Sequence, residues 1–178
     1  DNSFAVYQYL KRTRGDRYKY IWIFNDRKSM AKYPDARSCY RYSLKGFYYY
    51  YRAKLVFCTH GLYSFLTLHQ TDKIVNLWHG MPLKTIGCLD PKNNVYNPTM
   101  ADYLVVTSSM FQDIMSRAFN NIDKRKVLIL GQPRNDLLFE PTSFFLNRRI
   151  DVKKYKSVGL WLPTYKCSDL FLITQSLV

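Results

Sequence analysis

Short runs of consecutive hydrophobic residues alternate along this chain with longer segments in which hydrophobic residues recur every three or four positions. Continuous runs are typical of strands buried on both faces, and the longer spacing is typical of amphipathic helices. The pattern predicts strands at 18–24, 54–59, 73–78, 102–108, 126–131 and 157–164, and helices at 2–12, 38–53 and 109–119. This order indicates an α/β fold: a Rossmann-like parallel sheet covered by helices on both faces.

Polar residues and glycine refine the helix predictions. Asn2 or Ser3 is expected to cap the first helix, and Ser109 with Gln112 forms a capping box for the last. Gly46 is expected to weaken the middle helix, because glycine lowers helix stability. The face of that helix is expected to consist of Tyr40, Leu44, Phe47, Tyr48 and Tyr51.

The same pattern predicts how the chain divides. Residues 1–145 are expected to form one Rossmann-like domain, 146–156 a linker, and 157–178 the start of a truncated second domain. Ligands of parallel α/β sheets bind beyond the carboxyl ends of the strands. His60, His79, Ser108 and Arg134 each follow a predicted strand and are therefore expected to share one cleft.

Charge narrows the range of partners. The 178 residues include 27 Lys and Arg against 13 Asp and Glu, a formal net charge of +14. This excess points to an anionic partner: nucleic acid, an acidic membrane surface or a phosphorylated substrate. No apolar stretch approaches the roughly 20 residues that span a bilayer, so membrane contact is expected to be peripheral. The four cysteines form no CxxC pair, which favours reduced thiols in the cytosol.

His79 lies in "WHGMPLKTIG", at the start of a glycine- and proline-marked loop. A neutral imidazole can accept a proton from a hydroxyl group near neutral pH. Lys84 is a nearby cation that would keep His79 neutral, since it disfavours imidazolium. The alternative is a loop histidine bonded to the backbone.

Three further features each have two interpretations. His60 in "CTHG" is either a loop histidine or a second site residue, and a zinc site of Cys58, His60, His69 and Cys88 matches no standard spacing. Arg134 in "GQPRND" either holds a phosphate, or lies in a turn where it pairs with Asp136 or caps a helix. The tyrosines at 48–51, among basic residues, either stack on nucleic acid or form a stripe facing the core.

Taken together, these stretches resemble the CDP-glycerol glycerophosphotransferase family, the teichoic acid primases and polymerases and related capsule polymerases of bacteria. "WHGMPLKTIG" at 78–87 is similar to the family's WHG-x-P-x-K-x-x-G, and "GQPRNDLLF" at 131–139 to its G-x-PR-ND element. "LWLPTYKCSD" at 160–169 looks like the opening of the family's second domain. The matching motif residues are Trp78, Gly80, Pro82, Gly87, Gly131, Pro133, Asn135 and Asp136.

The resemblance implies the N-terminal half of a GT-B fold, and transfer of glycerol phosphate from CDP-glycerol to a hydroxyl of a lipid-linked acceptor. It implies that His79 is the base. The residues expected to bind substrate or phosphate, from their charge or their position after a strand, are Lys84, Arg134, Ser108 and His60. The donor is a substrate, and neither a cofactor nor a metal is expected. The expected place is the cytoplasmic face of the bacterial membrane. The family's second histidine and its diphosphate site lie beyond this chain, so these 178 residues alone are expected to transfer nothing.

Three alternatives stay open at this point. CDP-ribitol is the alternative donor. A basic nucleic-acid-binding α/β domain explains the charge and the tyrosines but leaves the WHG, PRND and PT elements without a reason, so nucleic acid is not expected as a partner. A regulatory remnant would keep the acceptor half without catalysis.

Overall fold

The computed structural model describes residues 2–31, 37–63, 73–92, 101–120, 122–139 and 156. Contacts divide the chain into two units, Asp1–Glu140 and Pro141–Val178, and nearly all described residues belong to the first. The strand expected at 157–164 lies outside the described residues. The domain borders expected at 145 and 156 therefore stay predictions.

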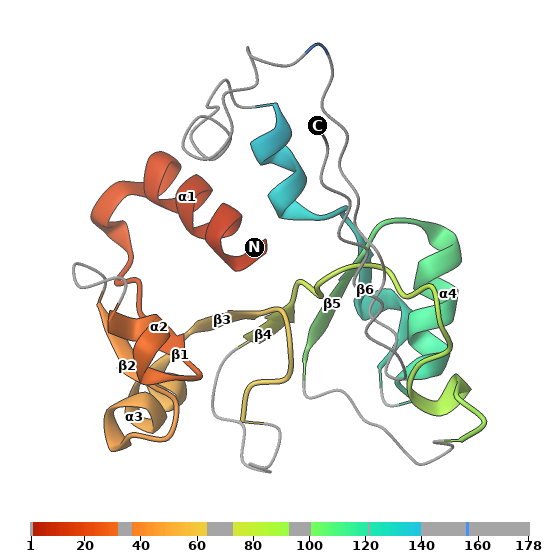
Figure 1. Ribbon diagram of the computed structural model, residues 1–178, viewed down its shortest axis with the longest axis horizontal. Coiled ribbons are helices and arrows are strands. Elements are labelled where there is room, and N and C mark those ends of the chain that lie inside the picture. Colours follow the sequence, from red (N-terminus) through yellow and green to blue (C-terminus); the bar gives the residue numbers. More distant parts are fainter. Residues whose placement is uncertain are drawn as a thin grey trace. The chain divides into compact units, whose positions relative to one another are not determined.

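Parallel strands form the centre of the first unit, as the sequence predicts (Figure 1). The described strands are divided between two sheets, where the sequence predicted one. The smaller sheet pairs β1 (Trp22–Phe24) with β2 (Ser38–Tyr40). The larger sheet has the order β3 (Leu55–Cys58), β4 (Lys73–Asn76), β5 (Tyr103–Val106) and β6 (Val127–Ile129), and every pair in it is parallel.

Two helices of the described part, α3 and α4, begin where a serine caps them. Ser43 accepts a hydrogen bond from the Gly46 amide, and Ser108 accepts one from the Phe111 amide. The described helices are α1 (Asn2–Arg14), α2 (Arg27–Ala31), α3 (Leu44–Arg52) and α4 (Ser109–Ala118), with the 3₁₀ turns η1 (Gly15–Arg17), η2 (Gly87–Leu89), η3 (Lys124–Lys126) and η4 (Pro133–Leu138).

Two cap predictions were wrong. The cap of α4 is Ser108 and not Ser109, and no capping box forms with Gln112. The Gln112 amide instead donates to the carbonyl of Val127 at 2.7 Å, which ties α4 to the start of β6. Asn2 does not cap α1 either; its side chain bonds to residues far along the chain.

The predicted helix 38–53 was also partly wrong. Its first three residues are strand β2, and the helix begins only after the Ser43 cap. Because the helix starts there, its buried face is centred on Gly46 and Tyr50, and Leu44 and Tyr48 face solvent. Phe47 and Tyr51 flank the buried positions, so this helix does present aromatic residues to the core.

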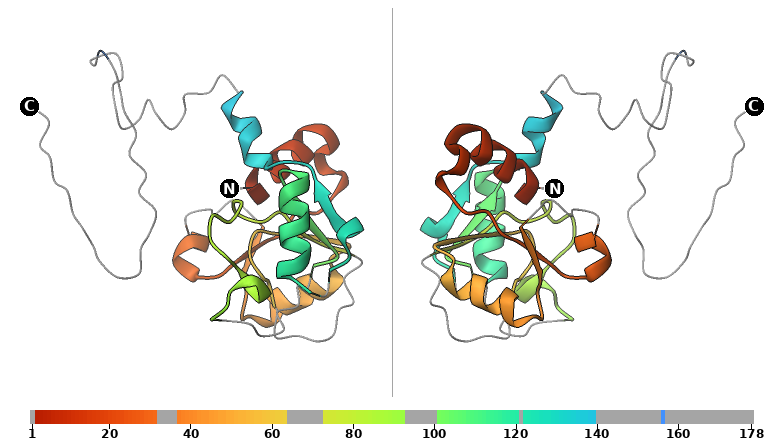
Figure 2. Two further views of the ribbon diagram at one scale, coloured as in Figure 1. Left: turned by 90° about the vertical axis from the view of Figure 1, so that its right-hand side faces the viewer. Right: turned by 90° about the vertical axis from the view of Figure 1, so that its left-hand side faces the viewer.

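The two clusters of buried hydrophobic residues lie on one face of the larger sheet. Tyr50 of α3 packs with Val56 and Ile74, and Met115 of α4 packs with Leu104 and Val127. The strand register places the four sheet residues on the same face. Both described helices that pack on this sheet therefore cover that one face, and the side views show α4 lying against the strands (Figure 2).

Helix α1 packs against η4, which follows the carboxyl end of β6 (Figure 2). The first residue of α1, Asn2, is completely buried and reaches the carbonyl of Trp78 just beyond β4. The fold therefore brings the start of the chain to the ends of the strands, where the candidate site lies.

Candidate active site

Three loops converge beyond the carboxyl ends of the larger sheet. His60 follows β3, His79 follows β4, and Arg134 follows β6, as the sequence pattern predicts. Parallel strands end at a common edge, so residues distant in sequence meet there. Three of the four polar residues expected in one cleft are joined by direct contacts.

The two histidines stack. The rings of His60 and His79 lie 4.3 Å apart between centroids, at an interplanar angle of 11°. The indole of Trp78 stacks with the His79 ring at 4.6 Å and 21°. The Trp78 indole also packs edge to face against Phe119, a core residue. The His79 ring is therefore held between neighbours on a rigid support.

An unusual backbone turns His79 out of the strand. Trp78 has a φ of 55°, a left-handed conformation that costs a non-glycine residue about 1 kcal/mol or more. The Asn76 carboxamide stabilises this turn by accepting a hydrogen bond from the Trp78 amide at 2.8 Å. Gly80 follows with a φ of 148°, which side-chain-bearing residues rarely adopt. The WHG sequence thus supplies a tight turn that presents the imidazole.

Arg134 contacts this turn directly. Its Nη1 donates to the carbonyl oxygen of His79 at 3.0 Å, across 55 residues of sequence. A side chain at position 80 would meet the same guanidinium, since a Cβ there would lie 3.6 Å from Nη2. This contact differs from both interpretations of Arg134 drawn from the sequence, and phosphate binding by Arg134 stays a prediction.

The surroundings lower the pKa of His79 below its usual value. Partial desolvation of the ring by its stacked neighbours is the largest cause, although His79 remains exposed overall; the adjacent His60 and the positive charge of Arg134 follow. The imidazole is therefore neutral near pH 7 and can accept a proton. The predicted electrostatic effect is present, but its source is Arg134 and not Lys84.

Lys84 and Ser108 are not among the residues that these contacts join in the described part of the chain. Lys84 is exposed, within the segment between β4 and η2. Ser108 lies beyond β5, and its hydroxyl accepts the Phe111 amide at the start of α4. Their assignment to substrate or phosphate stays a prediction. Among the other motif residues, Pro133 opens η4 and Gly87 opens η2, so both shape the loops around the site.

Asn2, which the sequence pattern offered only as a helix cap, belongs to the site. Its amide nitrogen donates to the Trp78 carbonyl at 2.8 Å and to Oε1 of Gln132 at 2.5 Å. Its Oδ1 accepts the backbone N–H of Arg134 at 3.1 Å. One buried carboxamide thus joins the helix start, the WHG turn and the PRND turn. The sequence shows Gln132 directly before "PRND", but the residue to which Gln132 bonds, Asn2, lies 130 residues away along the chain.

Two donors at the site lack acceptors within the described part of the chain. They are Nε1 of Trp78 and Nε2 of Gln132, both buried. Buried donors are normally satisfied, so these two groups are exceptions within the described part of the chain. No cluster of three or more metal-ligating side chains occurs among the described residues, and His69 of the weak zinc hypothesis lies outside them.

Comparison with protein families identifies the class. A model described as CDP-Glycerol:Poly(glycerophosphate) glycerophosphotransferase matches residues 1–175. This chain therefore belongs to that family, and the expected resemblance is confirmed.

Relatives of known name are only partly covered by this chain. It is 25% identical over 192 residues to the teichoic acid poly(glycerol phosphate) polymerase of Bacillus spizizenii, a match that covers 96% of this chain and 48% of the relative. It is 27% identical over 186 residues to the teichoic acid glycerol-phosphate transferase of Staphylococcus aureus, covering 93% of this chain and 47% of the relative. The chain thus spans about half the length of these relatives.

Solved structures agree in fold. The wall teichoic acid polymerase TagF superposes with a TM-score of 0.62 at 23% identity, over 78% of this chain and 36% of that one. A variant of the same polymerase soaked with CDPG gives 0.64 at 23% identity, over 78% and 37%. The likeness confirms the expected fold class, a Rossmann-like parallel α/β unit of the GT-B type.

Proposed function

We propose that this chain carries the base-bearing half of a transferase that moves glycerol phosphate from CDP-glycerol to an acceptor hydroxyl in teichoic acid synthesis. The main support is the stacked His60–His79 pair, whose neutral His79 ring faces the ends of parallel strands beside Arg134. Family membership supports the reaction type, and relatives named for glycerol phosphate favour glycerol over ribitol.

In the proposed step, His79 removes the proton from the acceptor hydroxyl as that oxygen attacks the phosphorus next to glycerol. A new phosphorus–oxygen bond forms, and the bond between the two phosphates of CDP-glycerol breaks. CMP leaves with the electron pair, and the acceptor now ends in a phosphodiester-linked glycerol. Phosphoryl transfer depends mainly on positioning and on neutralising charge. Arg134 is a candidate for that task.

The proposed acceptor is a lipid-linked, polyanionic chain. CDP-glycerol is the donor substrate, and the proposed step uses no resident cofactor or metal. Within the described part of the chain, no helix is long and apolar enough to cross a membrane. The net charge of +14 supports reversible attachment to the anionic cytoplasmic face of the bacterial membrane. Teichoic acid synthesis is preferred over the related capsule polymers because the named relatives act in it.

The test of the base is His79→Ala, measured as acceptor-dependent CMP release by the protein that carries this chain. Loss of a general base should lower turnover by roughly a hundred- to ten-thousand-fold. Added imidazole should restore part of the activity, because the vacated stacking position between Trp78 and His60 can accept a free imidazole ring.

The matched control is His79→Asn, which keeps a polar planar group but supplies no base. It should be as inactive as alanine and should not respond to imidazole. Unfolding by urea should show that both variants are folded. A loss of less than about tenfold in His79→Ala would show that this histidine is not the base.

A further inference from the structure

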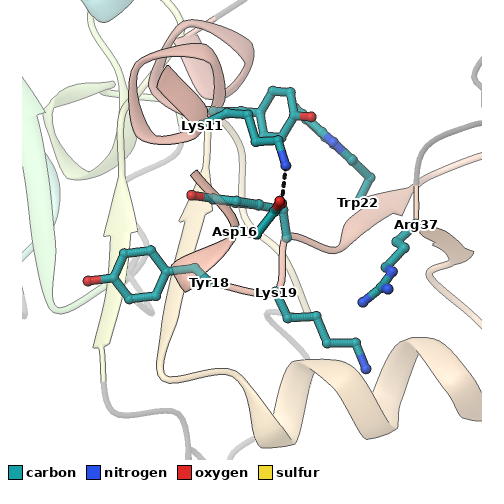
Figure 3. A pocket seen from close by; sticks show the side chains of 8 residues that line it. Lys11, Asp16, Tyr18, Lys19, Trp22 and Arg37 are labelled. Atoms are coloured by element: carbon teal, nitrogen blue, oxygen red, sulfur yellow. Dashed lines mark hydrogen bonds and ion pairs between the residues drawn. The ribbon is translucent and has the colours of Figure 1, made fainter. Parts of the chain in front are cut away.

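A pocket that the proposed reaction does not use lies between the last turns of α1, the η1 turn and strand β1 (Figure 3). Its volume is about 370 Å³, within the range of small-ligand sites. The charged groups in its lining are Lys11, Asp16, Lys19 and Arg37, and Tyr20 and Trp22 belong to its aromatic wall. Such a mixture of cations, one carboxylate and rings calls for a ligand with matching chemistry.

The pocket carries a positive excess. Lys11 forms an ion pair with Asp16, as Figure 3 shows. Lys19 and Arg37 form no ion pair among the described residues, although Arg37 acts electrostatically on the Asp16 carboxylate and Lys19 lies 5.2 Å from the centre of the Tyr49 ring. These two cations extend toward the same open space in Figure 3. Two converging cations of this kind suit a phosphate group.

The aromatic wall is held in place by its own contacts. Tyr7 meets Tyr20 edge to face at 5.4 Å and meets Trp22 in the same way at 5.3 Å. The Tyr20 hydroxyl donates to the Gly15 carbonyl at 3.3 Å. The wall therefore needs little ordering when a ligand binds, which favours affinity.

We propose that this pocket binds a phosphorylated polyol or sugar. Lys19 and Arg37 hold the phosphate, the exposed oxygens of Asp16 accept hydrogen bonds from ligand hydroxyls, and Trp22 packs against ligand carbon atoms. A nucleic acid fits less well. Nucleic acid binds through successive bases stacked on ring faces, whereas the Tyr7 ring is already engaged with both Tyr20 and Trp22.

Helix α1 connects the pocket with the candidate active site. Asn2, at one end, bonds to the WHG and PRND turns, and Lys11 lines the pocket nine residues later. Nine helical residues span about 14 Å, so a polyol phosphate chain of a few units could occupy both places. This extension rests on the proposed function, whereas binding in the pocket does not.

The test is titration calorimetry of the chain with a synthetic trimer of glycerol phosphate. The double variant Lys19→Gln with Arg37→Gln should weaken binding at least roughly tenfold, because each removes a charge-assisted contact. The control is Arg52→Gln with Lys54→Gln, which removes the same two charges outside the pocket and should change affinity less than about threefold. Equal weakening by both doubles, or no binding by the unaltered chain, would overturn the proposal.

Further probes separate the sources of binding. Asp16→Asn should strengthen binding of inorganic phosphate, because a negative charge is removed, but should reduce the preference for glycerol phosphate over inorganic phosphate. A single glycerol phosphate that binds as tightly as the trimer would identify a free small molecule as the ligand. Mixed-sequence RNA is the last probe. If it binds more tightly than the trimer, and if the Lys19 and Arg37 double variant no longer binds it, the pocket belongs to nucleic acid and the proposal is overturned.

The two proposals fail separately. Trimer binding in the pocket should persist in His79→Ala, which tests only the base. If the pocket serves the acceptor, the Lys19 and Arg37 double should raise KM for a long acceptor and leave KM for a single-unit acceptor unchanged. Full activity in His79→Ala with specific pocket binding would reject the base assignment alone.

Discussion

At the scale of single residues, Asn2 determines how the candidate site is held together. It is fully buried, and its carboxamide makes close hydrogen bonds to Trp78, Gln132 and Arg134. A buried amide that satisfies several loops at once specifies their relative positions. We therefore consider Asn2 a positioning residue, acting through the turns that carry His79 and Arg134.

Replacing Asn2 with alanine should destabilise the chain by about 2–4 kcal/mol, because it leaves the Gln132 carboxamide and the Arg134 amide without their partner. Urea unfolding measures this change. Asn2→Asp is the matched control: it keeps an acceptor for Arg134 but cannot donate to the Trp78 carbonyl or to Gln132. An Asn2→Ala variant as stable as the unaltered chain would contradict the network.

The charge state of His79 offers a second prediction at this scale. Its pKa is lowered by burial, by His60 and by Arg134. Arg134→Gln removes a positive neighbour, so protonation becomes easier and the pKa should rise toward its ordinary value. The acid limb of the activity profile should therefore move to higher pH. Titration of the His79 ring by NMR measures the shift.

Lys84→Gln is the control for that experiment. The sequence had assigned the neutralising charge to Lys84, whereas the structure assigns it to Arg134. Removing Lys84 should leave the His79 pKa unchanged. A larger shift from Lys84→Gln than from Arg134→Gln would restore the interpretation based on the sequence.

Position after a strand was enough to find His60, His79 and Arg134, because parallel strands bring their ends together. It could not find Asn2 or the buried role of Gln132. Both act through hydrogen bonds between segments 130 residues apart, and nothing in local spacing encodes such a partner. The stacking of the two histidines likewise depends on strand register, which places β3 beside β4.

At the scale of elements, helix α3 shows where periodicity misleads. The three-to-four spacing of aromatic residues runs back to Tyr40, but Ser38–Tyr40 form a strand that pairs with β1. A tertiary partner overrides a helical pattern in so short a segment. The buried face was then misassigned, since the helix begins at the Ser43 cap rather than at the start of the pattern.

The expected effect of replacing Gly46 depends on the packing of α3 against β2. On helix propensity alone, alanine should stabilise α3 by about 0.5–1 kcal/mol. A Cβ at position 46, however, would lie 2.5 Å from the Tyr40 carbonyl oxygen and 2.9 Å from the Tyr63 hydroxyl. The overlap with backbone should dominate, so we expect Gly46→Ala to destabilise the chain by about 1–3 kcal/mol.

Thermal or urea unfolding decides between the two effects, with Lys45→Ala as the control. Lys45 is the exposed neighbour in the same turn, so its replacement tests propensity without the contact. It should change stability by less than about 0.5 kcal/mol. A Gly46→Ala chain more stable than the unaltered one would show that α3 can move away from β2.

At the scale of the whole molecule, charge is unevenly distributed along the chain. Residues 1–54 contain 13 of the 27 Lys and Arg but only four of the 13 Asp and Glu, so they carry +9 of the net +14. Three of these basic residues lie in the last turn of α1. The basic η3 segment at 124–126 differs, because Lys124 and Arg125 pair with Asp113 and Asp123.

This asymmetry predicts which part of the chain meets an anionic membrane. Each basic residue near such a surface contributes about 1 kcal/mol, so replacing Arg12, Arg14 and Arg17 by glutamine should weaken binding to phosphatidylserine vesicles at least roughly tenfold. The matched control replaces Lys124, Arg125 and Lys126, which changes net charge equally but removes cations of which two are already paired. Co-sedimentation at low and high salt measures both triples, since screening should release the unaltered chain. Equal losses from the two triples would mean that net charge alone drives attachment, and binding that ignores salt would mean that attachment is not electrostatic.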